Sequence, residues 1–231
     1  MARIAAFEQF VERYEAWFDR HPAAYASELA AVRALWPSVR EALEVGVGTG
    51  RFAAPLGIRY GVDPSPAMRR RAAARGIQVV EGVAEALPFP DQRFEAVLMV
   101  TTLCFVEEPL QALREVRRVL QAGGFLVIGL IDRDSPLGRR YEEHQHESPF
   151  YREARFLSAS EVAVLMREAG FVELVWRQTL FSEPEKMCRP DPVRVGYGAG
   201  GFVVVRGRRA VDPEFLPGVS VDASPEGWQS G

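Results

Sequence analysis

The glycine-rich run at residues 44–52 constrains the fold of this chain more than any other stretch. It reads E-V-G-V-G-T-G-R-F, follows the apolar pair Ala42 and Leu43, and has a glycine at every second position from 46 to 50. This pattern predicts a strand that turns sharply into a helix, because glycine tolerates positive φ and lets a ligand approach the backbone without meeting a Cβ. The unpaired N–H groups at the start of that helix favour an anionic group above the loop. In a simpler interpretation, the glycines serve only the turn.

The loop of a dinucleotide-binding enzyme is the main rival interpretation of this run. That fingerprint needs its third glycine one position later than Gly50, and Arg51 stands there instead. An NAD-dependent oxidoreductase is therefore disfavoured.

An acidic residue further along the chain indicates a nucleoside ligand. Residues 58–65 read I-R-Y-G-V-D-P-S, which predicts a short second strand that ends in Asp63. A carboxylate at the end of the second strand can accept hydrogen bonds from both ribose hydroxyls of a nucleoside. The glycine run and Asp63 together predict a nucleoside-binding site at the ends of the first two strands.

These two motifs, E-V-G-V-G-T-G-R-F and G-V-D-P-S, strongly resemble those of the class I S-adenosylmethionine-dependent methyltransferases of small-molecule type. A third stretch, G-V-A-E-A-L-P-F at residues 82–89, resembles the G-D-A-E-x-L-P-F stretch of the ubiquinone/menaquinone C-methyltransferase-like branch. The resemblance extends over about residues 42–206. It implies that the glycine loop holds the methionine part of S-adenosyl-L-methionine, whose carboxylate would meet the helix start, and that Asp63 holds the ribose.

The resemblance also implies which residues form the cofactor site. Met68, one turn into a helix that begins at Pro66, would pack on the adenine, although a methionine at this spacing equally suits an ordinary core. The family often has an adenine-binding Asp where this chain has Val83, so the adenine would rely on the backbone around Ala84, on Glu85, or on neither. The expected cofactor-binding residues are Glu44, Gly46, Gly48, Gly50, Asp63, Pro64, Ser65, Met68, Ala84, Glu85 and Thr101.

Strand and helix patterns alternate from Leu43 onward, which predicts an α/β fold, a parallel sheet with helices on both faces. The run at 94–100 is apolar enough for a fully buried strand, and it delivers Thr101 and Phe105 to the carboxyl edge, where open α/β sheets bind ligands. Further strands are expected at 77–81, 125–130, 171–181 and 201–206. The resemblance implies a Rossmann-like sheet of seven strands, mostly parallel, with an antiparallel last strand beside the fifth.

Two helical patterns precede the first strand and predict an N-terminal helical cap at residues 1–37. Aromatic residues recur there at helical spacing. The resemblance favours a cap over the substrate pocket, with Tyr14 and Trp17 facing it, and buried packing is the alternative. The methyltransferase domain is expected at 38–206. Residues 207–231 have few periodic apolar positions, so we expect a largely disordered tail.

Residues 132–156 lack apolar periodicity and concentrate Tyr, His, Arg and Glu. Because this stretch leaves the fifth strand at the ligand edge, we expect a lid-like insertion that walls the substrate site. His144, His146 and Tyr141 are candidate catalytic bases, together with Glu142, although surface histidines on an irregular loop would look the same. No metal site is expected, since no Cys/His cluster has ligand spacing.

Composition narrows the class of partner. With 231 residues, 48% of them hydrophobic, the chain can bury the core of one domain. A formal net charge of −3 gives no electrostatic case for a nucleic-acid partner. No signal peptide or membrane-spanning run is visible, so we expect a cytoplasmic protein that acts on a small molecule. The sequence leaves the oligomeric state open.

The expected function is direct in-line transfer of a methyl group from S-adenosyl-L-methionine to a small-molecule acceptor, held near Phe105, Tyr14 and Trp17. Holding the nucleophile and the methyl group in line can contribute about 7–11 kcal/mol. A base is needed only if the nucleophile arrives protonated. The sequence does not distinguish carbon, oxygen, nitrogen and sulfur acceptors. The alternative is a catalytically silent regulator or partner subunit that binds the cofactor. It stays open because no acceptor-specific motif is present and because Val83 replaces the adenine-binding Asp of the family.

Overall fold

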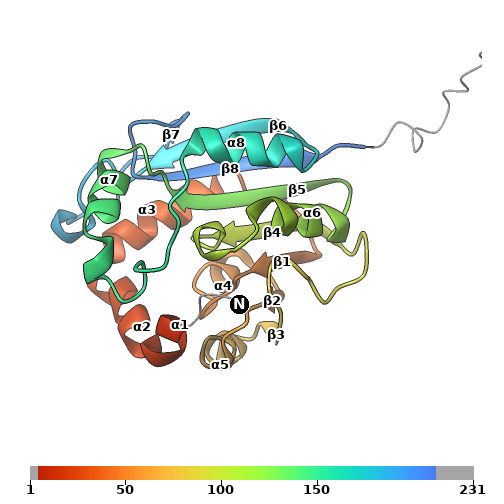
Figure 1. Ribbon diagram of the computed structural model, residues 1–231, viewed down its shortest axis with the longest axis horizontal. Helices are drawn as coiled ribbons and strands as arrows, with labels where there is room; N and C mark the ends of the chain where they lie inside the picture. Colours follow the sequence, from red (N-terminus) through yellow and green to blue (C-terminus); the bar gives the residue numbers. More distant parts are fainter. Residues whose placement is uncertain (1–4, 212–231) are drawn as a thin grey trace, which may run out of the picture.

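One sheet of eight strands runs through the computed structural model, which describes residues 5–211 (Figure 1). The strands lie in the order β3-β2-β1-β4-β5-β8-β6-β7. β1 to β5 are parallel, and β8 lies antiparallel between β5 and β6. This order confirms the Rossmann-like, mostly parallel fold with an antiparallel strand beside the fifth. The bounds are β1 Ala42–Val45, β2 Tyr60–Val62, β3 Gln78–Val80, β4 Phe94–Val100, β5 Leu120–Ile131, β6 Phe171–Thr179, β7 Arg194–Val195 and β8 Phe202–Arg209.

The sheet differs from expectation in its last strands. The seven expected strands are joined by β7, a two-residue strand that pairs with the edge of β6. Apolar periodicity could not reveal β7, because two residues are too short to show a period. β8 runs to Arg209 and so enters the segment that we expected to be a disordered tail. Residues 212–231 of that segment lie outside the described residues.

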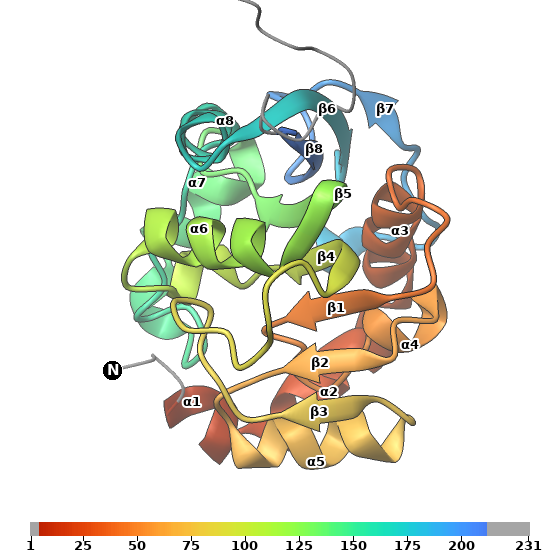
Figure 2. The same cartoon turned by 90° about the vertical axis from the view of Figure 1, so that its right-hand side faces the viewer.

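Helices cover both faces of the sheet, as the alternating pattern predicted. Figure 2 shows α6 and α8 on one side of the sheet and α3 and α4 on the other. Each face has its own apolar cluster: Leu43 and Met99 pack with α6 and α8, and Leu98 packs with α3. Burying one such side chain contributes about 1.5–3 kcal/mol. The helices are α1 Ala5–Gln9, α2 Val11–Arg20, α3 Pro22–Arg33, α4 Ala53–Leu56, α5 Pro66–Ala74, η1 Leu103–Phe105, α6 Pro109–Val119, α7 Pro136–Glu143, η2 Gln145–Glu147, α8 Ala159–Glu168 and η3 Pro184–Lys186.

Segment 132–156 contains the helix α7 and the short turn η2. α7 begins with Ser135, whose Oγ accepts a hydrogen bond from the Gly138 N–H at 2.9 Å, and with Pro136 in its first position. Only Leu137 and Gly138 of this helix are buried, so it lacks the apolar stripe that marks most helices. Figure 1 shows α7 and α2 on the side of the molecule toward which the parallel strands point.

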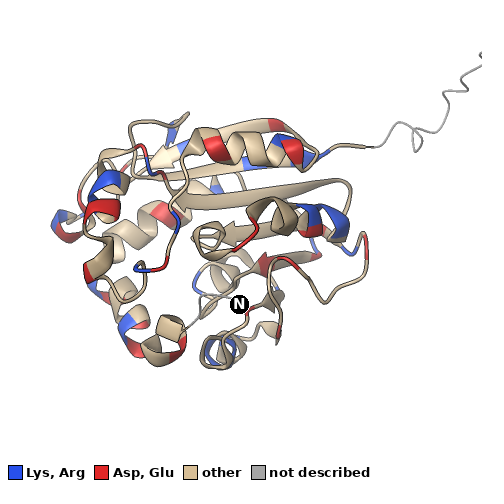
Figure 3. Cartoon of the chain, in the orientation of Figure 1, with Lys and Arg blue, Asp and Glu red and all other residues tan. Residues whose placement is uncertain are grey.

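Charged side chains lie mainly on the helices and loops (Figure 3). Both signs are mixed on the same helices, whereas β5 carries no charged residue. Within residues 5–211, none of the helices is long and apolar enough to cross a membrane.

Candidate active site

A cavity of about 590 Å³ lies at the carboxyl ends of four parallel strands. The last residues of β1, β2, β4 and β5 line it, namely Val45, Val62, Val100 and Ile131. Open parallel sheets bind ligands at this edge. Residues of α2 line one side of the cavity, and residues between 140 and 151 line another. The volume falls in the range of about 300–1,000 Å³ that is usual for small-molecule sites.

The glycine loop lies at one end of the cavity, where Gly46 and Gly48 line the wall. Gly46, Gly48 and Gly50 have φ values of +67°, +52° and +84°, in the left-handed region. A Cβ on Gly46 would overlap the side chain of Thr102, so packing within the protein requires glycine there. A Cβ on Gly48 would instead lie 3.6 Å from the Tyr14 hydroxyl. Gly46 thus serves packing, and Gly48 keeps the cavity open beside Tyr14.

Asp63 lies at the end of β2, as predicted, and lines the cavity although it is buried. Its Oδ2 accepts a hydrogen bond from the Gly48 N–H at 2.9 Å, and its Oδ1 accepts one from the Ser65 N–H at 2.9 Å. Burial raises the pKa of Asp63, and the two backbone hydrogen bonds oppose that rise. Each oxygen can still accept a further hydrogen bond. Asp63 therefore fixes the glycine loop and faces the cavity at once.

The other expected cofactor residues divide into two groups. Glu44, Gly50 and Ser65 do not line the cavity. Ser65 caps α5 and donates a hydrogen bond of 2.5 Å to Glu8 of α1, while burial raises the pKa of Glu44 behind the loop. The residues that do line the cavity are Pro64, Met68, Ala84, Glu85 and Thr101.

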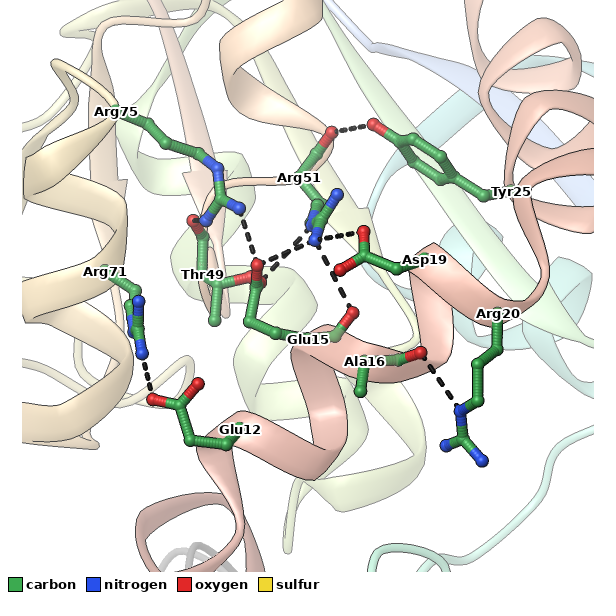
Figure 4. A network of polar contacts seen from close by, with 10 residues as sticks. All are labelled: Glu12, Glu15, Ala16, Asp19, Arg20, Tyr25, Thr49, Arg51, Arg71 and Arg75. Carbon is green, nitrogen blue, oxygen red and sulfur yellow. Dashed lines mark hydrogen bonds and ion pairs between the residues drawn. The ribbon is translucent and has the colours of Figure 1, made fainter.

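A network of charged side chains joins α2 to the glycine loop, and we call its members Glu15, Asp19, Arg51 and Arg75 the cap clamp (Figure 4). Glu15 Oε2 lies 2.8 Å from Arg51 Nη2 and 2.6 Å from Arg75 Nη2. Asp19 Oδ1 lies 3.1 Å from Arg51 Nη2. Arg75 also donates to the carbonyl of Thr49 in the loop at 2.5 Å. Arg51 and Arg75 therefore fasten α2 to the glycine loop.

Aromatic side chains line a large part of the cavity and form what we call the aromatic wall: Phe7, Tyr14, Trp17, Phe105, Tyr141, Phe150 and Tyr151. The predicted wall residues Tyr14, Trp17 and Phe105 all belong to it. Its members come from three separate stretches of the sequence, residues 7–17, residue 105 and residues 141–151. The rings of Phe7 and Phe105 lie 4.9 Å apart edge to face, and those of Tyr141 and Tyr151 lie 5.5 Å apart. These separations are typical of favourable aromatic pairs.

The structure brings only two of the four candidate bases to the cavity. Tyr141 and His144 line it, whereas Glu142 and His146 lie outside the lining. His146 is exposed and faces Glu147. Burial raises the pKa of Tyr141, so its hydroxyl stays protonated at neutral pH. His144 Nδ1 lies 3.0 Å from the Arg140 carbonyl. That carbonyl is an acceptor, so the neutral ring carries its proton on Nδ1 and a lone pair on Nε2.

Sequence reasoning missed Glu28 of α3. This carboxyl group is only 7% exposed and lines the cavity. Burial raises its pKa to about 8. The sequence offered no clear signal for it, because a lone acid in a helix is more often solvent-exposed.

The comparisons with known proteins agree with this geometry. A family model described as a methyltransferase domain matches residues 43–128. A crystal structure from Thermotoga maritima, described as an S-adenosylmethionine-dependent methyltransferase and a possible histamine N-methyltransferase, is 50% identical, with a TM-score of 0.87. The superposition covers 89% of this chain and 99% of that one.

Similarity to curated proteins extends over most of the chain. An uncharacterised protein of Methanocaldococcus jannaschii is 45% identical over 86% of this chain and 96% of its own length. A demethylmenaquinone methyltransferase of Roseiflexus castenholzii is 32% identical over 61% of this chain and 71% of its own length.

Proposed function

Because this chain belongs to the class I S-adenosylmethionine-dependent methyltransferases, we propose that it methylates a small-molecule acceptor held in the cavity against the aromatic wall. The chain is an S-adenosylmethionine-dependent enzyme, and the alternative of a catalytically silent regulator has no support among its relatives. The acceptor class and the roles of individual residues are the proposal.

The cofactor would occupy the end of the cavity that the glycine loop lines. Two features of the chain suit S-adenosylmethionine there. Gly48 leaves open space on the cavity side, and Asp63 keeps acceptor capacity on both oxygens after its two backbone hydrogen bonds. Asp63 would accept hydrogen bonds from the ribose hydroxyls, and Met68 would contact the adenine. Glu85 already accepts a hydrogen bond from the Glu107 N–H at 2.9 Å, so its remaining oxygen would face the ligand.

The acceptor would occupy the end that the aromatic wall lines. Bound S-adenosylmethionine supplies an electrophilic methyl group. The contribution of the chain is to hold the acceptor nucleophile in line with that group and to exclude water, and such positioning can amount to about 7–11 kcal/mol. Phe105, Tyr14 and Trp17 would fix the acceptor by ring contacts. If the nucleophile arrives protonated, His144 is the better base candidate, because it carries a lone pair and Tyr141 stays protonated.

The observation that carries this proposal is the position of one carboxylate. Asp63 faces the cavity and holds Gly48 at the same time, so its loss should damage cofactor binding. We expect Asp63→Asn to weaken binding of S-adenosylhomocysteine by about ten- to a hundredfold, measured by calorimetry, since a hydrogen bond to a charged group contributes about 1.5–3 kcal/mol. Asp91→Asn, at an exposed acid paired with Arg118, is the matched control and should bind normally.

Methyl transfer is measured separately with radiolabelled S-adenosylmethionine and a small-molecule cell extract as acceptor. We expect label in the small-molecule fraction and none in the protein or nucleic-acid fractions. Label confined to macromolecules would overturn the small-molecule acceptor. An unchanged dissociation constant for Asp63→Asn would remove the ribose assignment.

A further inference from the structure

Glu28 lines the acceptor cavity without a partner of its own. It is 93% buried, and among residues 5–211 it has no hydrogen bond or ion pair. Its neighbours in α3 do have partners: the Ser27 hydroxyl, for example, donates to the Ala23 carbonyl at 2.8 Å and accepts from the Asp191 N–H at 2.9 Å. A buried carboxyl group with no partner is costly to the fold, so its place beside a cavity calls for a ligand.

The surroundings of Glu28 place it at the acceptor end of the cavity. Burial raises the pKa of Tyr14, Tyr141 and Tyr151, and the charge of Glu28 adds to that rise in all three. All three tyrosines belong to the aromatic wall. Glu28 therefore lies within electrostatic reach of the surface that would hold the acceptor.

The other charged groups that line the cavity do not neutralise Glu28. They are Arg13, Arg20, Asp63, Glu85, Arg140, Glu147 and Glu185, with His144 as the further titratable group. Arg140 pairs with Glu183 at 2.8 Å and Glu185 at 3.0 Å, and Arg20 donates to the Ala16 carbonyl. Burial is the sole cause of the raised pKa of Glu28, about 8, so no cation lies close enough to lower it.

An organic cation would complete this site. An ammonium group gives a buried carboxylate a charge-assisted hydrogen bond, and the faces of aromatic rings attract the same cation. A neutral acceptor could satisfy the carboxyl group with one hydrogen bond but would leave the rings without a cation. An anionic acceptor would meet the buried acid Glu28 directly. The combination of one buried acid with a wall of tyrosine, tryptophan and phenylalanine thus selects a positive charge.

We propose that Glu28 is a specificity-determining residue and that the methyl acceptor carries an ammonium group, which Glu28 binds as an ion pair inside the aromatic wall. This inference rests on the proposed function, since it identifies the class of acceptor for the same cavity. In the free protein at pH 7 Glu28 holds a proton. Binding an ammonium ion leaves Glu28 as a carboxylate, and its proton passes to the buffer.

The test uses calorimetry on the full chain saturated with S-adenosylhomocysteine. The probes are 2-phenylethylamine, which is an ammonium ion at pH 7, and 2-phenylethanol, its neutral analogue. We expect the amine to bind at least tenfold more tightly than the alcohol. Titrations in two buffers of different ionisation enthalpy should show the release of about one proton per amine bound. Glu28→Gln should abolish both the preference and the proton release, and Glu28→Asp should restore part of the preference.

Glu147→Gln is the matched control, because it removes the same charge from an exposed residue at the cavity rim. It should keep the preference for the amine. Equal binding of amine and alcohol, binding of neither, or an unchanged preference in Glu28→Gln would each overturn the inference. Binding of S-adenosylhomocysteine is measured first in every variant. If the parent protein does not bind S-adenosylhomocysteine, the proposed function itself fails. If it binds S-adenosylhomocysteine but shows no preference for the amine, only the assignment of Glu28 fails.

Discussion

Gly46 and Gly48 share a left-handed backbone, yet substitution should affect them differently. A Cβ on Gly46 would overlap Thr102, so Gly46→Ala should lower the free energy of unfolding by about 1–3 kcal/mol through overpacking. A Cβ on Gly48 meets only the Tyr14 hydroxyl at 3.6 Å. Gly48→Ala should therefore lower the free energy of unfolding only through the strain of a left-handed alanine, about 1–2 kcal/mol. Its main effect should be at least tenfold weaker binding of S-adenosylhomocysteine.

Melting temperature without ligand and calorimetry with ligand separate the two effects. Gly57→Ala is a suitable control, because Gly57 also has positive φ, +71°, but has open space around its Cβ position and lies outside the cavity. It reports the backbone strain alone. Normal ligand binding by Gly48→Ala would show that the loop has been misassigned as the cofactor site.

Glu28 makes the stability of the free protein depend on pH. Its pKa of about 8 in the folded state lies above the ordinary value of 4.5. A pKa that is higher in the folded state favours folding at pH values below the pKa of the unfolded state. That contribution to the free energy of unfolding is lost as the pH rises through the pKa of the folded state, at a slope of at most about 1.4 kcal/mol per pH unit. Between pH 5 and 8 the parent protein should therefore lose more unfolding free energy than Glu28→Gln. Denaturant titrations of both proteins at the two pH values measure the difference; parallel pH curves would show that Glu28 stays ionised.

Single residues differ in how far the sequence could assign them. Gly46, Gly48 and Asp63 could be placed at the cavity because each belongs to a short motif whose geometry is local. Glu28 could not, because a lone acid in a helix becomes unusual only once burial is known, and burial depends on packing against distant strands. The roles of the expected site residues stay predictions.

At the scale of elements, the cap clamp is the contact that positions α2. Glu15 and Arg51 are only 13% and 19% exposed. Burial raises the pKa of Glu15, but hydrogen bonds from Arg51 and Arg75 outweigh it and hold the pKa below the usual value. Glu15→Gln should lower the free energy of unfolding by about 1–3 kcal/mol, speed hydrogen exchange in residues 11–20, and weaken binding of S-adenosylhomocysteine severalfold.

Glu12→Gln provides the control on the same helix. Glu12 pairs with Arg71 at the surface, where the side chains are 74% and 46% exposed (Figure 4). Exposed pairs contribute only about 0–1 kcal/mol, so this variant should match the parent in exchange and in binding. Equal effects of the two substitutions would mean that the clamp does not hold the cap.

Elements with local signals could be predicted, and elements without them could not. The strands follow from apolar runs. The capping box of Ser158 and Glu161 at the start of α8 is a local signal of the same kind. α7 has too few buried residues to show an apolar period. The cap clamp could not be predicted, because Glu15 lies 36 and 60 positions from its two arginine partners.

At the scale of the whole molecule, two segments distant in sequence close on one cavity. Residues 11–33 line it from one side and residues 140–151 from another. We expect both to exchange backbone hydrogen more slowly when S-adenosylhomocysteine is bound, because closure over the ligand excludes water.

His144→Ala should lower turnover and spare cofactor affinity, whereas His146→Ala, outside the cavity, should match the parent. Equal protection with and without ligand would make residues 132–156 a fixed part of the fold.

The overall architecture could be predicted from the sequence because alternating apolar strands and helices allow few connections. The mostly parallel sheet and the antiparallel strand beside β5 are confirmed. The shape of the acceptor end could not be predicted, since it arises where the first helices meet residues 140–151. That meeting depends on tertiary contacts such as the ring pair of Phe7 and Phe150, at 5.5 Å.

The hydrogen bond from Gly48 to Asp63 has a thermodynamic consequence. It fixes the loop in the free protein, so the conformational entropy that the loop loses is lost when the chain folds and not when the ligand arrives. Cofactor binding should then show only a small unfavourable entropy from ordering of the protein. Any change that loosens the loop lowers the stability of the fold and the affinity for the cofactor together.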